Sequence, residues 1–120
     1  MTSGFERGEV YWFDLRDSEA ENLRPFIILQ TDWIRGLNTL LAVPCTTEMR
    51  RMEQPTGIFI SKAESGLPSD SVAICHLLTA LDKSRESGNG PIGRVTGRTL
   101  NRILFVVTEL IGIDAETFME

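Results

Sequence analysis

The hydrophobic pattern changes its period near residue 96, and this change limits the folds that the chain can adopt. Before it, short runs rich in β-branched and aromatic residues alternate with clusters of turn formers, which predicts strands. The predicted strands cover residues 8–15, 25–30, 39–45, 57–60, 71–75, 77–82 and 92–95. After it, apolar residues recur with the spacing of one helix face, at Leu100, Ile103, Leu104, Val107, Leu110 and Ile111.

Local signals mark the ends of these elements. Thr96 or Thr99 can cap the start of the helix, and Gly112 can end it. Pro25 suits the first position of a strand, and Pro44 marks a strand end, an edge or a bulge. Short strands followed by one helix predict a mainly β fold, a small, strongly bent antiparallel sheet or barrel with the C-terminal helix packed against it.

Length and composition fit one globular domain over residues 1–120. Of the 120 residues, 42% are hydrophobic and 24% are charged, which is typical of a soluble chain with one core. No apolar run approaches the ~20 residues that cross a bilayer. The N-terminus lacks the basic and apolar segments of a secretion signal. We therefore expect a cytoplasmic protein that does not bind membranes.

Charge and cysteine content restrict the ligands. The net charge of −5 argues against non-specific attraction to nucleic acid, although arginines cluster locally and leave room for a basic groove. Cys45 and Cys75 are far apart, and His76 is the only histidine. This spacing is not that of a zinc site, so we expect buried free thiols, no metal site and no cofactor.

Three stretches match known motifs in order along the chain. "RGEVYWFDL" at 7–15 fits R-G-[DE]-[VI]-[WY], "SEAENLRP" at 18–25 fits S-E-Q-x-G-x-R-P, and "VPCTT" at 43–47 fits V-P-[CIV]-T. A weaker match covers "DSVAICHLLTALDKSR" at 70–85. With these motifs the chain resembles the MazF/PemK/Kid family of type II toxins. The resemblance implies an SH3-like barrel with a C-terminal helix. It also implies a metal-independent endoribonuclease that cuts single-stranded RNA, usually mRNA, as a homodimer silenced by a cognate antitoxin.

The resemblance also implies which residues act. Metal-free RNA cleavage needs a proton acceptor, a proton donor and groups that stabilise charge on the phosphate. Arg24 and Thr46 match the family's functional arginine and threonine, and Arg24 suits electrostatic stabilisation rather than base catalysis. Ser18 and Glu19 match the S-E pair, where Glu19 accepts a proton, orients Arg24 or reads a base. Alternatively, Arg24 forms a surface salt bridge with Glu19 or Glu21.

Other candidates have an equally good structural explanation. His76 is either a catalytic histidine, since its side chain titrates near neutrality, or a partly buried hydrogen-bonding residue. Arg50 and Arg51 either contact the RNA backbone or pair with neighbouring glutamates, and Thr47 lines the site. Trp33 either stacks on a base or covers the core.

The sequence departs from the family pattern in ways that leave rival functions open. The loop over residues 16–24 is short, with Ala20 and Asn22 where the family has glutamine and glycine, and Leu77 and Thr79 alter the usual substrate surface. A catalytically inactive binding module is therefore one alternative. A gyrase poison of the CcdB type is another, although the chain ends without the Trp-Gly-Ile tail of those proteins. The RNA cleavage motif and the identity of the antitoxin do not follow from the sequence.

Overall fold

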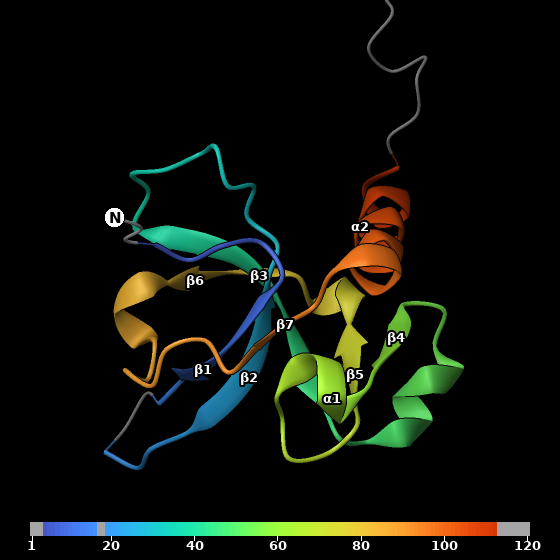
Figure 1. Cartoon of the computed structure of the whole chain (residues 1–120), viewed down its shortest axis with the longest axis horizontal. Coiled ribbons are helices and arrows are strands. Elements are labelled where there is room, and N and C mark those ends of the chain that lie inside the picture. Colours follow the sequence, from blue (N-terminus) through green and yellow to red (C-terminus); the bar gives the residue numbers. More distant parts are fainter. Residues whose placement is uncertain (1–3, 17–18, 113–120) are drawn as a thin grey trace, which may run out of the picture.

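A computed structural model describes residues 4–16 and 19–112. These residues form one bent antiparallel sheet in the order β4-β5-β3-β2-β1-β7, with β6 paired to β3 (Figure 1). The strands are β1 (Glu9–Asp14), β2 (Leu23–Ile28), β3 (Thr39–Thr46), β4 (Gly57–Ile60), β5 (Ser71–Ile74), β6 (Thr79–Asp82) and β7 (Gly93–Arg94). The helices are α1 (Lys62–Ser65), α2 (Gly97–Ile111) and the 3-10 turns η1 (Met49–Glu53), η2 (Cys75–Leu77) and η3 (Lys83–Arg85). The predicted mainly β fold with a C-terminal helix is confirmed.

Strand β3 bends the sheet by changing its partner. Its first half, from Thr39 to Ala42, pairs with β6, whereas Cys45 and Thr46 pair with β5. Pro44 lies between these two ladders and is paired only with Phe26 of β2. A proline has no N–H to donate, so it is tolerated where the strand leaves one neighbour and joins the next.

The start of β2 differs from the prediction. The strand begins at Leu23, so Pro25 is its third residue and not its first. Pro25 stands opposite Trp12 of β1, and Arg24 stands opposite Phe13. Pairing with β1 therefore extends β2 to two residues before Pro25. Arg24 consequently belongs to a β-ladder and not to a loop.

The sheet packs apolar side chains on both of its faces, because alternate residues of a strand point to opposite sides. One core is built around Val10, Ile27, Val43 and Ile103, and the C-terminal helix closes it. The second core lies on the other face and is largely aromatic, with Tyr11, Phe13, Phe26, Ile28, Leu40, Ala42 and Leu81. The two faces of β1 thus serve two cores and not one core and solvent.

Helix α2 covers the first core with only part of its predicted apolar face. Ile103 is fully buried, and Leu100, Leu104 and Val107 pack around it. Leu110 and Ile111 are exposed. Thr96 is the N-cap residue but makes no side-chain cap bond, and Gly112 ends the helix with φ of 79° as predicted. No helix in the described ranges has both the length and the apolar character that a membrane span requires.

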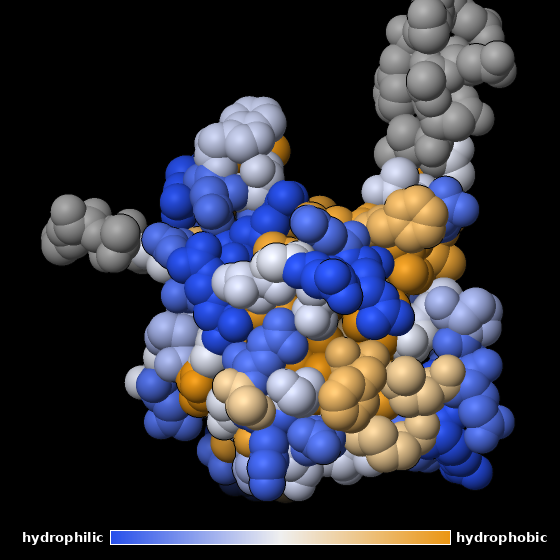
Figure 2. Space-filling view, turned by 45° about the vertical axis from the view of Figure 1, so that its right-hand side comes forward, coloured by the Kyte–Doolittle hydropathy of each residue, from blue (hydrophilic) through white to orange (hydrophobic). Residues whose placement is uncertain are grey.

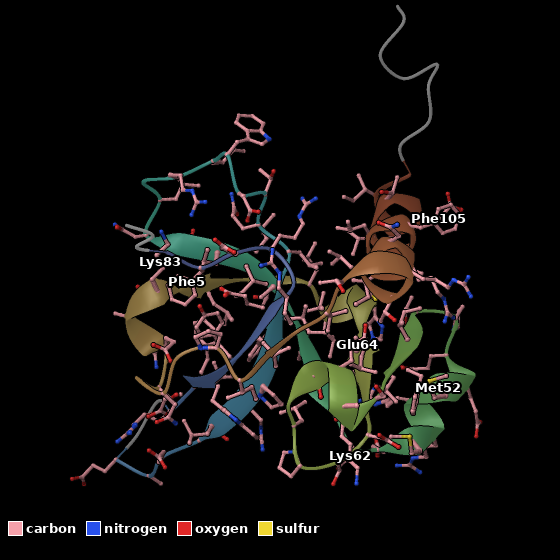
Figure 3. All side chains as sticks on the ribbon, viewed as in Figure 1. Phe5, Met52, Lys62, Glu64, Lys83 and Phe105 are labelled. Carbon is pink, nitrogen blue, oxygen red and sulfur yellow. The ribbon has the colours of Figure 1, made fainter. Side chains whose placement is uncertain are left out.

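Short helix α1 is fixed against β7 by two glycines. Gly66 ends α1 with φ of 78°, and a Cβ there would collide with the carbonyl group of Ile92. A Cβ at Gly93 would collide with the carbonyl group of Ser65. The hydroxyl group of Thr99 in α2 also donates a hydrogen bond to the carboxylate of Glu64. Figure 3 labels Glu64 between the two helices. These close contacts hold the loop that follows α1.

Candidate active site

A cleft of about 510 Å³ lies between the start of β2, the end of β3 and the loop that follows α1. This region is at the lower centre of Figure 1. The cleft is lined by Trp12, Leu23, Arg24, Pro25, Cys45, Thr46, Thr47, Leu67, Pro68, Ser69 and Ser71. All three matched motifs therefore meet in one cavity, through Trp12, Arg24 and Thr46.

Arg24 and Thr46 lie at matching positions near the start of β2 and the end of β3. The last recorded pair of this ladder is Phe26 with Pro44, and each of the two site residues lies two positions further along its strand. Arg24 is exposed, and within residues 4–16 and 19–112 it makes no ion pair and no side-chain hydrogen bond. The predicted alternative, a salt bridge with Glu19 or Glu21, is not found in this part of the chain. The guanidinium is available to an anion in the cleft.

The hydroxyl group of Thr46 is oriented by the backbone that follows it. Its Oγ1 accepts a hydrogen bond from the backbone N–H of Glu48 at 3.2 Å. Because the oxygen accepts in that bond, its own proton remains to be donated to a ligand. Thr47 also lines the cleft, as predicted. An arginine fork and a hydroxyl donor on adjacent strands form a site suited to a phosphate oxygen.

The apolar wall of the cleft is not among the site residues that the family resemblance implies. Trp12 is half-buried and lines the cleft together with Leu67 and Pro68. An aromatic ring beside a phosphate-binding group provides a stacking surface for a base. The alternation of β1 showed that Trp12 and Tyr11 lie on opposite faces, but not which face meets the cleft.

The loop that carries Leu67 and Pro68 is braced by hydrogen bonds at both ends. The buried Ser65 accepts from the N–H of Leu67 at 3.0 Å, and Asp70 accepts from the N–H of Lys62 at 2.8 Å. The hydroxyl of Ser71 donates to the carbonyl of Ser69 at 3.1 Å. These bonds give the cleft a wall of defined shape opposite Arg24.

The two cysteines are free and buried, as predicted. Burial raises the pKa of the Cys45 thiol to about 12, with a smaller contribution from the nearby Cys75. Burial likewise raises the pKa of Cys75 to about 11. Both thiols are therefore protonated at neutral pH, and Cys45 lines the cleft as an apolar group and not as a nucleophile.

His76 does not meet the cleft. It lies in η2, beyond the far end of β5 from Ser71, and β5 alone spans at least about 10 Å. Its Nδ1 is 2.7 Å from the hydroxyl of Thr56. The hydrogen-bonding alternative for His76 thus has a named partner, whereas a catalytic role within one chain has no support from the geometry.

Arg50 and Arg51 are already paired with a neighbour. Arg50 bonds to Glu48 at 3.0 Å, and Arg51 bonds to the same carboxylate at 3.2 Å. The hydrogen bond from Arg50, followed by that from Arg51, lowers the pKa of Glu48. Both arginines line a separate shallow hollow with Glu53 and Gln54. Pairing with a neighbouring glutamate therefore describes Arg50 and Arg51 better than direct contact with RNA does.

Three further candidates lie outside the cleft or outside the described residues. Trp33 is 81% exposed in the loop beyond the far end of β2, so it neither covers the core nor lines the cleft. Glu19 is exposed and does not line the cleft, although its carbonyl group accepts from Arg16. Ser18 falls outside the described residues.

Comparison with known proteins shows the family of the chain. A family model described as PemK-like, MazF-like toxin of type II toxin-antitoxin system matches residues 6–111. The chain belongs to this toxin family. A MazF endoribonuclease of Staphylococcus saprophyticus is 32% identical over 83 residues, which are 66% of this chain and 69% of that protein.

Two solved structures have the same fold as this chain. An endoribonuclease in complex with its cognate antitoxin from a mycobacterial species has a TM-score of 0.76 at 23% identity. The match covers 92% of this chain and 98% of that one. A MazE-MazF structure from Deinococcus radiodurans has a TM-score of 0.75 at 17% identity, covering 91% and 97%. At such identities the likeness shows that this PemK/MazF-like toxin shares the fold of those proteins.

Proposed function

We propose that this PemK/MazF-like toxin is a metal-independent endoribonuclease that cleaves single-stranded RNA in the cytosol. The observation that carries the proposal is the meeting of Arg24 and Thr46 in one cleft with the ring of Trp12. The relationship to a named MazF endoribonuclease supports the same activity. The substrate is single-stranded because a base must leave its stack to reach Trp12.

The chemistry of this site is attack of a ribose 2′-hydroxyl on the adjacent phosphate. The 2′-hydroxyl gives its proton to a base, and its oxygen bonds to phosphorus while the bond to the 5′-oxygen breaks. The 5′-oxygen takes up a proton from solvent, which leaves a 2′,3′-cyclic phosphate and a 5′-hydroxyl. Arg24 and Thr46 donate hydrogen bonds to the phosphate oxygens as negative charge builds on them. Strand pairing holds their backbones in place before the reaction, since Arg24 is paired with Phe13 of β1 and Thr46 with Val72 of β5.

The cleft of one chain supplies charge stabilisation but no evident base. None of the described residues that line it is a carboxylate or an imidazole, and the Cys45 thiol is protonated at neutral pH. The acceptor of the 2′-hydroxyl proton therefore comes from outside the lining residues, and Glu19 of the adjoining loop remains our candidate. Rate enhancement then depends chiefly on Arg24 and Thr46.

We propose that the toxin works as a homodimer. Exposed apolar side chains on the described surface support this assembly, and Figure 2 shows apolar side chains gathered over α2 and the surface beside it. The large hydrophobic side chains exposed on η1, β4 and α2 are Met49, Met52, Phe59, Phe105, Leu110 and Ile111. Figure 3 shows Phe105 pointing outward from α2 and Met52 on η1. A patch of this kind on a small domain is typical of a protein interface. Light scattering at micromolar concentration should give twice the chain mass, and a monomer would contradict the dimer.

The proposed partner besides RNA is an antitoxin chain. An endoribonuclease of the same fold was solved in complex with its cognate antitoxin, which supports a protein inhibitor for this chain as well. The expected consequence is inhibition of cleavage at a one-to-one ratio of antitoxin to toxin chains or below. A purified antitoxin that neither binds nor inhibits would contradict it.

A labelled single-stranded RNA in excess EDTA tests the activity. Cleavage of the RNA, with a 2′,3′-cyclic phosphate end detected by mass spectrometry, is the expected result. A 2′-deoxy version of the same oligonucleotide should remain intact because it lacks the nucleophile. Cleavage that needs a divalent ion would refute the metal-free mechanism. Binding without cleavage would favour an inactive binding module.

A further inference from the structure

The loop between β1 and β2 leads directly into Arg24. It leaves β1 at Asp14 and enters β2 at Leu23, and these two residues form the last pair of the ladder. One step further out, the N–H of Leu15 donates to the carbonyl group of Asn22 at 2.9 Å. The base of the loop therefore decides the course of the backbone that delivers Arg24 to the cleft.

The carboxylate of Asp14 draws both sides of this base together. Its Oδ1 accepts from the backbone N–H groups of Arg16 and Asn22, each at 3.0 Å. Its Oδ2 accepts from the guanidinium of Arg16. The side-chain bond from Arg16, followed by the backbone bond from Asn22, lowers the pKa of Asp14 to about 2. At neutral pH the carboxylate is thus charged and accepts from both arms of the loop.

Arg85, from a distant part of the sequence, donates hydrogen bonds to the same end of the β1–β2 loop. Its Nη1 donates to the carbonyl oxygen of Arg16 at 2.8 Å and to that of Asp14 at 3.4 Å. Such contacts couple η3 to the loop over about seventy residues of sequence, a separation that no local pattern predicts.

Arg85 is itself held relative to β1. Asp82 caps η3 by accepting from the N–H and the hydroxyl of Ser84 at 2.8 and 2.7 Å. After the turn, the N–H of Ser87 donates to the carbonyl group of Trp12 at 2.9 Å. The turn that carries Arg85 is therefore anchored to the strand from which the loop departs.

The surroundings of Arg85 argue against direct contact with RNA. It lines a polar hollow of about 490 Å³ that is separate from the cleft. Four carboxylates, Asp14, Glu21, Asp82 and Glu86, share this hollow with two arginines. A phosphate would be repelled there.

We propose that Arg85 and Asp14 are positioning residues that clamp the base of the β1–β2 loop, so that Arg24 enters the cleft in a single arrangement. The catalytic part of this inference rests on the proposed ribonuclease function, whereas the clamp itself does not. A guanidinium displaced by about 1 Å loses much of its effect on a transition state.

Amide hydrogen exchange tests the clamp without any assay of activity. In Arg85→Ala the N–H groups of Leu15 and Asn22 should exchange at least about 10-fold faster, because local opening of the loop becomes easier. Arg35→Ala is the matched control, since Arg35 also donates to a backbone carbonyl, that of Phe5, at 3.4 Å. Unchanged exchange at both amides, or equally faster exchange across the whole sheet, would overturn the clamp.

Single-turnover cleavage tests the consequence for catalysis. Arg85→Ala should slow the chemical step by about 10- to 100-fold while RNA affinity and its salt dependence stay unchanged. Arg85→Lys should restore only part of the rate, because lysine carries its donors on a flexible stem and not on a pre-organised planar group. Weaker binding with a smaller salt slope, fully rescued by lysine, would identify an RNA contact and overturn the proposal. If the wild-type toxin cuts no RNA, the proposed function fails, while the exchange result still decides the clamp.

Discussion

Arg24 and Thr46 lie on adjacent antiparallel strands, each two residues beyond the Phe26–Pro44 pair that ends the β2–β3 ladder. Two residues that are far apart in the sequence thus present a guanidinium and a hydroxyl to one cleft. Because both are carried by strands and not by loops, their separation is determined by the ladder. The predictions for Arg24 and Thr46 follow from this placement.

Arg24→Ala should reduce single-turnover RNA cleavage by roughly 100-fold or more, the scale for losing one pre-organised donor to a developing charge. Arg24→Lys should recover little, because a point charge does not reproduce the planar fork. Thermal melts of both variants should match the wild type, since the side chain is exposed and without an ion pair in the described part of the chain. Near wild-type cleavage by Arg24→Ala would remove the arginine from the mechanism.

Thr46→Val should lower the cleavage rate by a similar factor, because the β-branched shape is kept while the donor is lost. Thr46→Ser keeps the hydroxyl and should retain most of the activity. The N–H of Glu48 loses its acceptor in the valine variant, so a small loss of thermal stability is also expected. Equal rates for the valine and serine variants would contradict a role for the hydroxyl.

The two tryptophans should behave differently. Trp12→Leu should weaken RNA binding about tenfold or more, the scale of one lost base stack, whereas Trp12→Phe should retain most affinity. Trp33→Leu is the matched control, since Trp33 is exposed and distant from the cleft. Fluorescence anisotropy with a labelled RNA and inactive Arg24→Ala protein measures these affinities. Loss of binding in the Trp33 variant alone would reverse the assignment.

Gly66→Ala should destabilise the protein by about 1–3 kcal/mol or more, because strain at positive φ is added to a collision with Ile92. Gly36→Ala offers a matched control: its φ of 86° is similar to the 78° of Gly66, but nothing lies within 4 Å of the new Cβ. The difference between the two variants in denaturant unfolding isolates the close approach of α1 and β7. Equal losses would show that the contact contributes nothing.

Alkaline pH should weaken the fold through its two cysteines. Burial raises the pKa of Cys45 from 9.0 to about 12 and that of Cys75 from 9.0 to about 11. The stability that neutral thiols contribute is complete below pH 9 and is lost as the pH rises toward these folded-state values. Denaturant unfolding between pH 8 and 11 measures this loss, and the Cys45→Ala/Cys75→Ala variant should show less of it. Rapid alkylation of the native protein at pH 8 would contradict the burial.

Local sequence patterns sufficed for the elements and for two members of the site. The alternation in residues 9–14 and the helical spacing in residues 100–111 are properties of contiguous residues, so they predict β1 and α2 directly. The R-P and V-P-x-T motifs likewise identify Arg24 and Thr46 from neighbouring residues. These features could be predicted because each is specified by residues that lie within a few positions of one another in the sequence.

Pairing between segments far apart in the sequence determined which other residues reach the cleft and the β1–β2 loop. Trp12 became part of the cleft because β1 pairs with β2 in one register, and a shift of one residue would have turned Tyr11 toward it. His76 and Trp33 were separated from the cleft by the lengths of β5 and β2, which no motif records. Arg85 met the β1–β2 loop from about seventy residues away. Short-range periodicity specifies which face of a segment is apolar, whereas the register and partner of each strand depend on the packing of the whole chain.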